Sequence, residues 1–317
     1  MIRLILTCAA LLLPGLAAAQ AYPLTIAHKF GETVIETRPH SIATVDFAGA
    51  DDLLALGVQP VVIRHWYGSQ DGALWPWAAP LLRSSPEILR GEINYEQIAR
   101  AEPDVILALW SGITAGDYEQ LSRIAPVVAV PAGMGDFELP WDRRARIAGR
   151  VIGREADADA QITAIEGRLD AIAAAHPEWA TKTAAAAFAM RGSPGAYTPR
   201  DIRVQILAQM GFSQPAALLD AGTREASFAL TLSEEALKVI DSDVILWISA
   251  TGDFTAIDAL VTRPYLAAAT QGREVLAGKI MTGALSHASL LSLPFALDAL
   301  VPALEAALAG KGPVRLP

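Results

Sequence analysis

Short apolar runs alternate with helical patterns along most of the chain. In the first half, apolar runs at 42–45, 60–63 and 105–109 are separated by segments with helical spacing at 51–56 and 95–101. Consecutive parallel strands need such an intervening segment, usually a helix. The chain must cross back to the end of the sheet at which the first strand began before the next strand can run in the same direction. The pattern therefore predicts βαβ units built around parallel sheets.

The same pattern returns in the second half of the chain. Residues 96–107 align without gaps on residues 235–246. In each copy a glutamate opens a helix, and eight positions later an aspartate opens a Val-Ile-Leu strand. A glycine after an apolar helical segment also recurs, at Gly57 and Gly211, and each predicts a helix C-cap that leads into a strand. Two α/β lobes of like construction are therefore expected.

A long stretch without strand character lies between the two halves. It is rich in Ala, Arg, Glu, Asp and Ile at helical spacing, and Pro177 ends it because proline cannot continue the helical hydrogen bonds. A helix of roughly 30 residues would be about 45 Å long. Gly149 and Gly153 are its weak points, where a kink or a break could form. The predicted organisation is a lobe at 22–140, a single connecting helix at 141–176 and a second lobe at 182–317.

The first nineteen residues have the features of a signal peptide. Arg3 gives a basic start, residues 4–16 are apolar, and residues 17–19 are alanines suited to a signal peptidase. The apolar part is shorter than the roughly 20 residues that cross a bilayer as a helix. We expect cleavage of residues 1–19 and export to the periplasm. A lipid anchor at Cys8, the only cysteine, is a minor alternative because Thr7 precedes it.

Length and composition agree with this organisation. A chain of 317 residues, 52% of them hydrophobic, can form about two domains with separate cores. The formal net charge of −9 disfavours non-specific binding to nucleic acid or to an anionic membrane surface. An anionic ligand would have to be attracted by a local group of arginines. We expect a monomer.

The lobe-one segments resemble the periplasmic binding proteins for iron-siderophore complexes and cobalamin, which deliver their ligand to ABC importers. The matching segments, in the family's order, are 39–44, 54–61, 90–96, 102–107 and 121–127, with looser matches at 232–235, 243–246 and 289–300. The resemblance implies two doubly wound, Rossmann-like α/β lobes joined by a single long α-helix, with the ligand in the cleft between them. It also implies that a ferric siderophore or similar chelate is the ligand and that the protein itself needs no cofactor.

The loops after the predicted strands contain most of the candidate ligand-binding residues, since ligands bind open α/β sheets beyond the carboxyl ends of the strands. Arginine can donate two hydrogen bonds to chelate oxygens, and aromatic rings can wall a bulky ligand. In the resembled family, the arginine that opens the Arg-x-x-x-Asn-x-Glu stretch, here Arg90, contacts the iron chelate. The candidates are Arg90, Trp110, Trp66, Tyr67, Arg64, Arg191, Tyr197, Arg224, Phe228 and His287.

Two glutamates have a different predicted role. Glu96 and Glu235 lie at equivalent points of the repeat, at exposed helix starts where the helix dipole favours a carboxylate. In the resembled family one surface glutamate of each lobe docks onto arginines of the permease dimer, and these two residues match by position. Glu234 is an adjacent rival to Glu235.

The sequence also bears on other classes of function. An enzyme is disfavoured because the sequence has no nucleophile elbow, His-Glu-x-x-His motif, phosphate loop or dinucleotide fingerprint. A bare-metal site is also disfavoured because the histidines are dispersed singly. Cobalamin and haem remain alternatives within the family. Haem would need an axial ligand such as Tyr67, Tyr197 or His287. The sequence identifies neither the chelator nor the permease.

Overall fold

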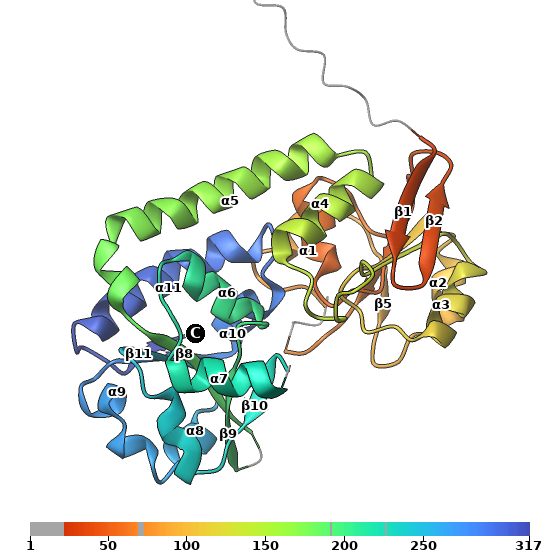
Figure 1. Ribbon diagram of the computed structural model, residues 1–317. Coiled ribbons are helices and arrows are strands. Elements are labelled where there is room, and N and C mark those ends of the chain that lie inside the picture. Colours follow the sequence, from red (N-terminus) through yellow and green to blue (C-terminus); the bar gives the residue numbers. More distant parts are fainter. Residues whose placement is uncertain (1–21, 69–72, 191, 226) are drawn as a thin grey trace, which may run out of the picture.

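The structure is a computed structural model that describes residues 22–68, 73–190, 192–225 and 227–317. It contains two α/β lobes, with one long helix running along both of them (Figure 1). The predicted fold class, two α/β lobes linked through helical structure, is confirmed. The predicted signal peptide at 1–19 and the candidate Arg191 lie outside the described residues.

Lobe one contains a parallel sheet of five described strands in the order β5-β4-β3-β6-β7. Its central strands β3 and β6 are fully buried, as expected for parallel strands that are covered on both faces. An antiparallel hairpin of β1 and β2, which the sequence analysis did not predict, precedes this sheet. The elements of lobe one are β1 (Leu24–His28), β2 (Gly31–Ile35), β3 (Ile42–Thr44), α1 (Gly49–Ala55), β4 (Val62–Arg64), η1 (Ala79–Leu81), β5 (Glu87–Leu89), α2 (Tyr95–Arg100), β6 (Val105–Ala108), α3 (Ala115–Ser122) and β7 (Val127–Ala129).

Lobe two has a mixed sheet of six described strands in the order β10-β9-β8-β11-β12-β13. Strands β8, β11, β12 and β13 run parallel, whereas β9 and β10 are antiparallel to their neighbours. The short link between β8 and β9 leaves no room for a crossover, so β9 must return antiparallel. The elements are η2 (Pro177–Thr181), β8 (Ala184–Met190), β9 (Ser193–Tyr197), α6 (Ile202–Gln209), α7 (Ala216–Glu225), β10 (Ala229–Thr231), η3 (Glu235–Ile240), β11 (Val244–Ile248), α8 (Thr255–Asp258), η4 (Arg263–Tyr265), α9 (Ala267–Thr270), β12 (Glu274–Ala277), α10 (Lys279–His287), α11 (Ser292–Leu308) and β13 (Val314–Leu316).

The single connecting helix predicted for 141–176 is interrupted. Helix α4 (Trp141–Val151) ends in a turn, and α5 (Glu155–Ala175) begins after it. Gly153 in this turn has a φ of +70°, a left-handed conformation that ends many helices and that glycine adopts without strain. The predicted helix is therefore broken at Gly153, one of the two glycines at which the sequence allowed a break. The 21 residues of α5, about 31 Å long, form the helix that runs along both lobes (Figure 1).

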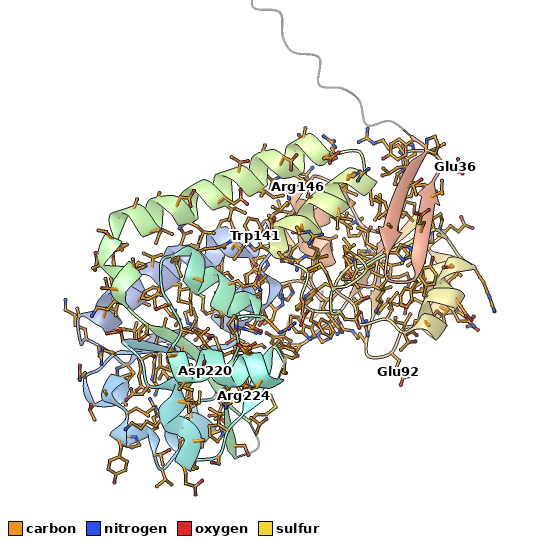
Figure 2. All side chains as sticks on the ribbon, in the orientation of Figure 1. Glu36, Glu92, Trp141, Arg146, Asp220 and Arg224 are labelled. Atoms are coloured by element: carbon orange, nitrogen blue, oxygen red, sulfur yellow. The ribbon has the colours of Figure 1, made fainter. Side chains whose placement is uncertain are left out.

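Helices α4 and α5 lie in close contact. A Cβ atom added at Gly149 of α4 would lie 2.6 Å from the Cβ of Ala158 of α5, so only glycine allows this approach. Trp141, at the start of α4, is buried. Arg146, on the same helix (Figure 2), is partly exposed and pairs with Asp159 of α5 at 2.8 Å. The break thus folds α4 back onto α5.

Hydrogen bonds at the start of the central strands reveal the internal repeat. Asp104 precedes β6, and its Oδ2 accepts hydrogen bonds from the backbone N–H groups of His40 and Ser41 at 2.7 and 2.9 Å. Asp243 precedes β11, and its Oδ2 accepts hydrogen bonds from the backbone N–H and the hydroxyl of Thr183 at 2.9 and 3.0 Å. In both lobes the aspartate that precedes the strand in the sequence repeat therefore ties two neighbouring parallel strands together at their amino ends.

A buried polar contact joins the two lobes. Arg144 of α4 is 1% exposed, and its Nε donates to Oδ2 of Asp52 in α1 of lobe one at 2.9 Å. Its Nη2 donates to the backbone carbonyls of His287 and Ala288 in lobe two, each at 2.9 Å. One apolar core cluster also contains side chains from both lobes. These contacts fix how the lobes face each other and so define the space between them.

Candidate functional site

A cleft of about 420 Å³ lies between the lobes. Lobe one contributes Trp66 and Tyr67, which follow β4, and lobe two contributes the ends of β8 and β11 together with residues of β9, α6 and α10. Strands β4, β8 and β11 thus all reach this cleft with their carboxyl ends. This is the position at which ligands bind open α/β sheets.

Trp66 forms the aromatic wall on the lobe-one side. Its ring packs edge-to-face against Trp110, with the centroids 5.2 Å apart, and lies 5.4 Å from the ring of Phe47. Trp110 is only 8% exposed and supports Trp66 from behind. The guanidinium of Arg64 lies 4.3 Å over Phe47 and donates hydrogen bonds to three backbone carbonyls. Trp110 and Arg64 therefore hold the wall in place and do not line the cleft.

Apolar side chains from lobe two form the opposite wall. The rings of Phe188 and Tyr197 lie 5.0 Å apart. Phe228 is 46% exposed and Met190 is 62% exposed, and both line the cleft. Large apolar side chains that remain exposed around a concavity are typical of a ligand-binding surface. This wall therefore suits a bulky ligand with an apolar periphery.

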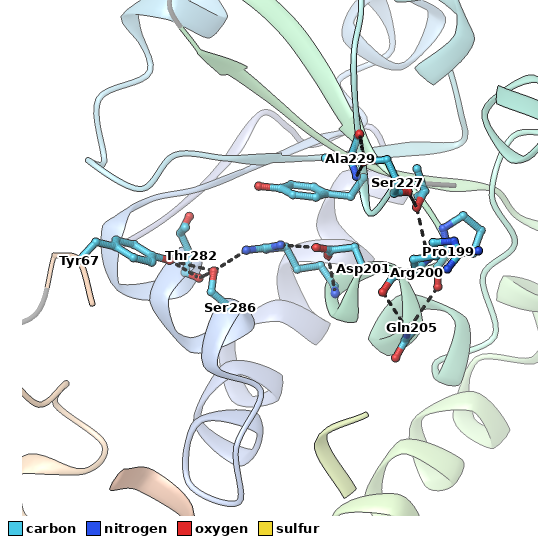
Figure 3. A network of polar contacts seen from close by, with 12 residues as sticks. Tyr67, Pro199, Arg200, Asp201, Gln205, Ser227, Ala229, Thr282 and Ser286 are labelled. Carbon is cyan, nitrogen blue, oxygen red and sulfur yellow. Dashed lines mark hydrogen bonds and ion pairs between the residues drawn. The ribbon is translucent and has the colours of Figure 1, made fainter. Parts of the chain in front are cut away.

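A chain of polar contacts crosses from one lobe to the other at the cleft (Figure 3). The hydroxyl of Tyr67 lies 2.8 Å from Oγ of Ser286 in α10. The same Oγ accepts a hydrogen bond from Nη2 of Arg203 at 2.7 Å and donates its own hydrogen to the carbonyl of Thr282. Nη1 of Arg203 donates to Oδ2 of Asp201 at 2.7 Å. Tyr67 of lobe one and Arg203 of lobe two thus meet at the hydroxyl of Ser286.

Burial and charge keep these groups in defined protonation states. Burial works to lower the pKa of the Arg203 guanidinium, but the adjacent carboxylate of Asp201 raises it above its ordinary value, so the group stays charged. The guanidinium also lies 4.3 Å over the ring of Tyr197. Burial raises the pKa of Tyr67 and of Tyr197. Both phenols are therefore neutral at physiological pH.

The cleft contains some of the residues predicted from the sequence. Trp66, Tyr67, Tyr197 and Phe228 line it, two from each lobe. These side chains lie up to about 160 positions apart in the chain, and the packing of the lobes brings them together. Trp110 and Arg64 stand behind this lining, as described above.

Arg90, the first choice of the sequence analysis, does not line the interlobe cleft. It follows β5 and borders a separate open hollow of about 600 Å³, together with Asn94 and Glu96. Burial lowers the pKa of His65, which follows β4, and the positive charge of Arg90 lowers it further. The two side chains therefore lie near each other. Strand β5 is the edge strand of its sheet, and its end is therefore displaced from the cleft by one strand.

Arg224 and His287 also lie outside the cleft lining. Arg224 is exposed in the last turn of α7 (Figure 2). His287 is 4% exposed, its Nδ1 is 3.0 Å from the carbonyl oxygen of Gly283, and its ring lies 5.5 Å from that of Trp66. Burial lowers the pKa of His287 to about 3, so the ring is neutral. The side chain of His287, a candidate ligand-binding residue from the sequence, therefore belongs to the core and does not line the cleft.

The two predicted docking glutamates are placed differently from their rival. Glu96, in the first turn of α2, and Glu235, at the start of η3, are both exposed. Glu234 instead accepts hydrogen bonds from the backbone N–H groups of Val261 and Thr262, each at 3.2 Å. The carboxylate of Glu234 therefore fixes a loop of its own lobe, and Glu235 is the accessible member of the pair.

Arg203 is not among the residues predicted from the sequence. The sequence pattern points to the loop directly after the first strand of lobe two and not to β9, which carries the chain back to a second loop. Asp201, at the end of that loop, caps α6 by accepting a hydrogen bond from the backbone N–H of Arg203 at 2.9 Å. An aspartate N-cap followed two positions later by arginine is the local signal that could have pointed to this site.

Two further features concern metals and membranes. Within the described ranges, no three His, Cys, Asp or Glu side chains converge in a way that could hold a metal ion. None of the helices in the described part of the chain combines the length and the apolar character needed to cross a bilayer.

The chain is similar to known proteins. A family model described as periplasmic binding protein matches residues 42–275. The probable siderophore-binding lipoprotein YfiY of Bacillus subtilis (strain 168) is 25% identical over 242 residues, which cover 72% of this chain and 70% of the relative.

Solved structures extend the similarity to most of the chain. A periplasmic solute binding protein from Mycobacterium smegmatis str. MC2 155 is 30% identical with a TM-score of 0.77, and the match covers 90% of this chain and 98% of the other. PiaA of Streptococcus pneumoniae TIGR4, in complex with ferrichrome, is 26% identical with a TM-score of 0.76. That match covers 91% of this chain and 99% of PiaA. The two-lobed fold is therefore shared over nearly the whole described chain.

Proposed function

Because the chain belongs to the periplasmic binding protein family, we propose that it captures a ferric siderophore or similar iron chelate and delivers it to an ABC importer. The observation that carries the proposal is the interlobe cleft, in which aromatic walls from both lobes surround the guanidinium of Arg203. The names of its relatives, a siderophore-binding lipoprotein and a ferrichrome complex, support the same ligand class. The chelator would hold the iron, so the protein would supply no metal ligand.

We further propose that the protein is exported and that residues 1–19 are removed. Arg3, the apolar run at 4–16 and the alanines before position 20 support a cleavable signal. Mass spectrometry of the protein purified from the periplasm would show a mature chain that begins at residue 20 or shortly after it. A mature protein that retains residues 1–19 would contradict this.

Ligand binding can be tested by titrating the mature protein with ferric chelates of the citrate, hydroxamate and catecholate classes, with haem and with cobalamin. Tryptophan fluorescence and calorimetry would report binding. Phe228→Ala removes an exposed ring from the cleft and should weaken the best ligand by about 1 to 2 kcal/mol, roughly 5- to 30-fold in Kd.

Tyr265→Ala is the matched control, because Tyr265 is 84% exposed and does not line the cleft. It should leave the affinity unchanged. Equal effects of the two variants on affinity would refute the place of the ligand in the cleft. Saturable binding of haem or cobalamin, without binding of any iron chelate, would refute the proposed ligand.

Delivery to the permease is a separate part of the proposal. Glu96 and Glu235 are exposed, one on each lobe, and are suited to meet arginines of two permease subunits. Glu96→Ala combined with Glu235→Ala should leave chelate binding intact and reduce uptake by cells that express the importer. Glu119→Ala with Glu166→Ala removes two other exposed carboxylates and should not affect uptake. A loss of uptake in the control pair alone would contradict the assignment.

A further inference from the structure

The described residues of the cleft offer almost no net charge to a ligand. Of the described residues that line it, only Arg203 and Asp253 carry a charge, and these charges are opposite. Hydrogen bonds from the backbone N–H and hydroxyl of Thr255 lower the pKa of Asp253, so this carboxylate is ionised. The other lining side chains are aromatic, aliphatic or hydroxyl-bearing. The described part of the lining is therefore close to neutral.

The charge of Arg203 is itself largely compensated. Asp201 is 6% exposed and lies against the guanidinium at 2.7 Å. A second N–H of the guanidinium is used by Ser286. Arg203 can still donate hydrogen bonds to a chelate oxygen, because a guanidinium has five N–H groups. It cannot neutralise a ligand that carries several negative charges, because its own charge is already paired.

Three other described cationic side chains near the cleft do not line it. Arg64 donates to the carbonyls of three residues behind the wall of Trp66. Arg144 is buried and paired with Asp52 at 2.9 Å. Lys279 borders a different hollow of about 290 Å³. In the described part of the chain, the walls of the cleft therefore include no second cation that could compensate an anionic ligand.

We infer that the cleft selects a ferric chelate of low net charge, such as a tris-hydroxamate, over polyanionic catecholate or carboxylate chelates; this rests on the proposed function. Three singly charged hydroxamates balance Fe³⁺ and give a neutral complex, whereas three doubly charged catecholates leave a trianion. A trianion in this cleft would lose hydration without gaining compensating charge. A neutral complex needs only hydrogen bonds from Arg203 and contact with the five aromatic rings of the lining.

The first experiment compares three probes on the mature protein by calorimetry. These are ferrichrome as a neutral tris-hydroxamate, a hexadentate tris-catecholate ferric trianion, and ferric dicitrate. We expect ferrichrome to bind at least about 100-fold more tightly than either anionic chelate. Equal or tighter binding of an anionic chelate would overturn the inference and leave the proposed function standing. Failure of all ferric chelates to bind would overturn the proposed function itself.

A charge-gain variant tests whether charge is the selecting property. Thr251 is exposed and lines the cleft, so Thr251→Lys adds one positive charge without disturbing the core. The variant should strengthen binding of the tris-catecholate about fivefold or more and change ferrichrome binding by less than about threefold. Thr270→Lys, at an exposed position of α9 outside the cleft, should change neither. Identical responses of both chelates to Thr251→Lys would overturn the inference.

Discussion

Replacing Arg144 with methionine removes the buried cation that joins the two lobes. In the native protein, Arg144 donates hydrogen bonds to the carboxylate of Asp52 and to the carbonyls of His287 and Ala288 at the end of α10, all at 2.9 Å. Arg144 and Asp52 are each 1% exposed. Methionine fills much of the same volume but leaves the carboxylate without its counter-charge and the two carbonyls without a donor.

The cost of this change can be estimated from its parts. Removing one partner of a buried ion pair typically destabilises a protein by about 3 to 5 kcal/mol, because the remaining charge is buried without compensation. A folded domain is stable by only about 5 to 15 kcal/mol, so this is a large fraction of the total. Asp52→Asn in the Arg144→Met background removes the unpaired charge and keeps an oxygen that can accept from the backbone N–H of Leu290. The double variant should therefore recover part of the loss.

Urea unfolding, followed by circular dichroism and by tryptophan fluorescence, measures these effects if the two transitions coincide. Arg146→Met is the matched control, because Arg146 is on the same helix and pairs with Asp142 and Asp159, but its side chain is 41% exposed. Such a surface pair contributes at most about 1 kcal/mol. A loss for Arg144→Met no greater than that for Arg146→Met would refute the view that Arg144 is a stabilising tether between the lobes.

Two further predictions concern a buried carboxyl group and a close helix contact. Burial raises the pKa of Asp51 to about 6, so its stabilising contribution is complete below about pH 4 and is lost as the pH rises through 6. The side chain in the Asp51→Asn variant stays neutral at every pH. The unfolding free energy of the variant minus that of the wild type should therefore rise by about 1 kcal/mol between pH 5 and 7. A difference that does not change with pH would contradict the raised pKa. Gly149→Ala should cost about 1 to 3 kcal/mol in thermal or urea unfolding because its Cβ would lie 2.6 Å from Ala158. Gly167→Ala, where a Cβ meets nothing within 4 Å, should instead stabilise α5 by about 0.5 to 1 kcal/mol, and similar effects of both substitutions would rule out the close helix contact.

The sequence by itself determined the alternation of elements and the duplication of the lobes. Runs such as 105–107 and 244–246 are buried strands in the structure, and the aspartate before each of them ties its strand to a neighbour. Gly57 and Gly211 both adopt positive φ after a helix, as their positions predict. These features depend on interactions within one element or between adjacent ones. A local pattern of apolar and polar residues is therefore sufficient to reveal them.

Other local features could not be read with the same accuracy. Gly153 stands out in the sequence as a weak point of the connecting helix, but only the structure shows that the chain turns there and begins a second helix. The predicted parallel sheets also gave no indication of the antiparallel return of β9. In both places the outcome depends on what the segment packs against, which propensity does not encode.

The composition of the cleft was decided by the tertiary structure alone. Arg90 follows an edge strand and is displaced from the cleft, while Arg203 reaches it from the start of α6. Tyr67 and Ser286, separated by 219 positions in the chain, share a hydrogen bond across the lobes. Hydrophobic periodicity reports whether a side chain faces solvent or core within its own element. Which elements meet at a cleft depends on strand order and on how whole lobes pack, and these are long-range properties that no local pattern contains.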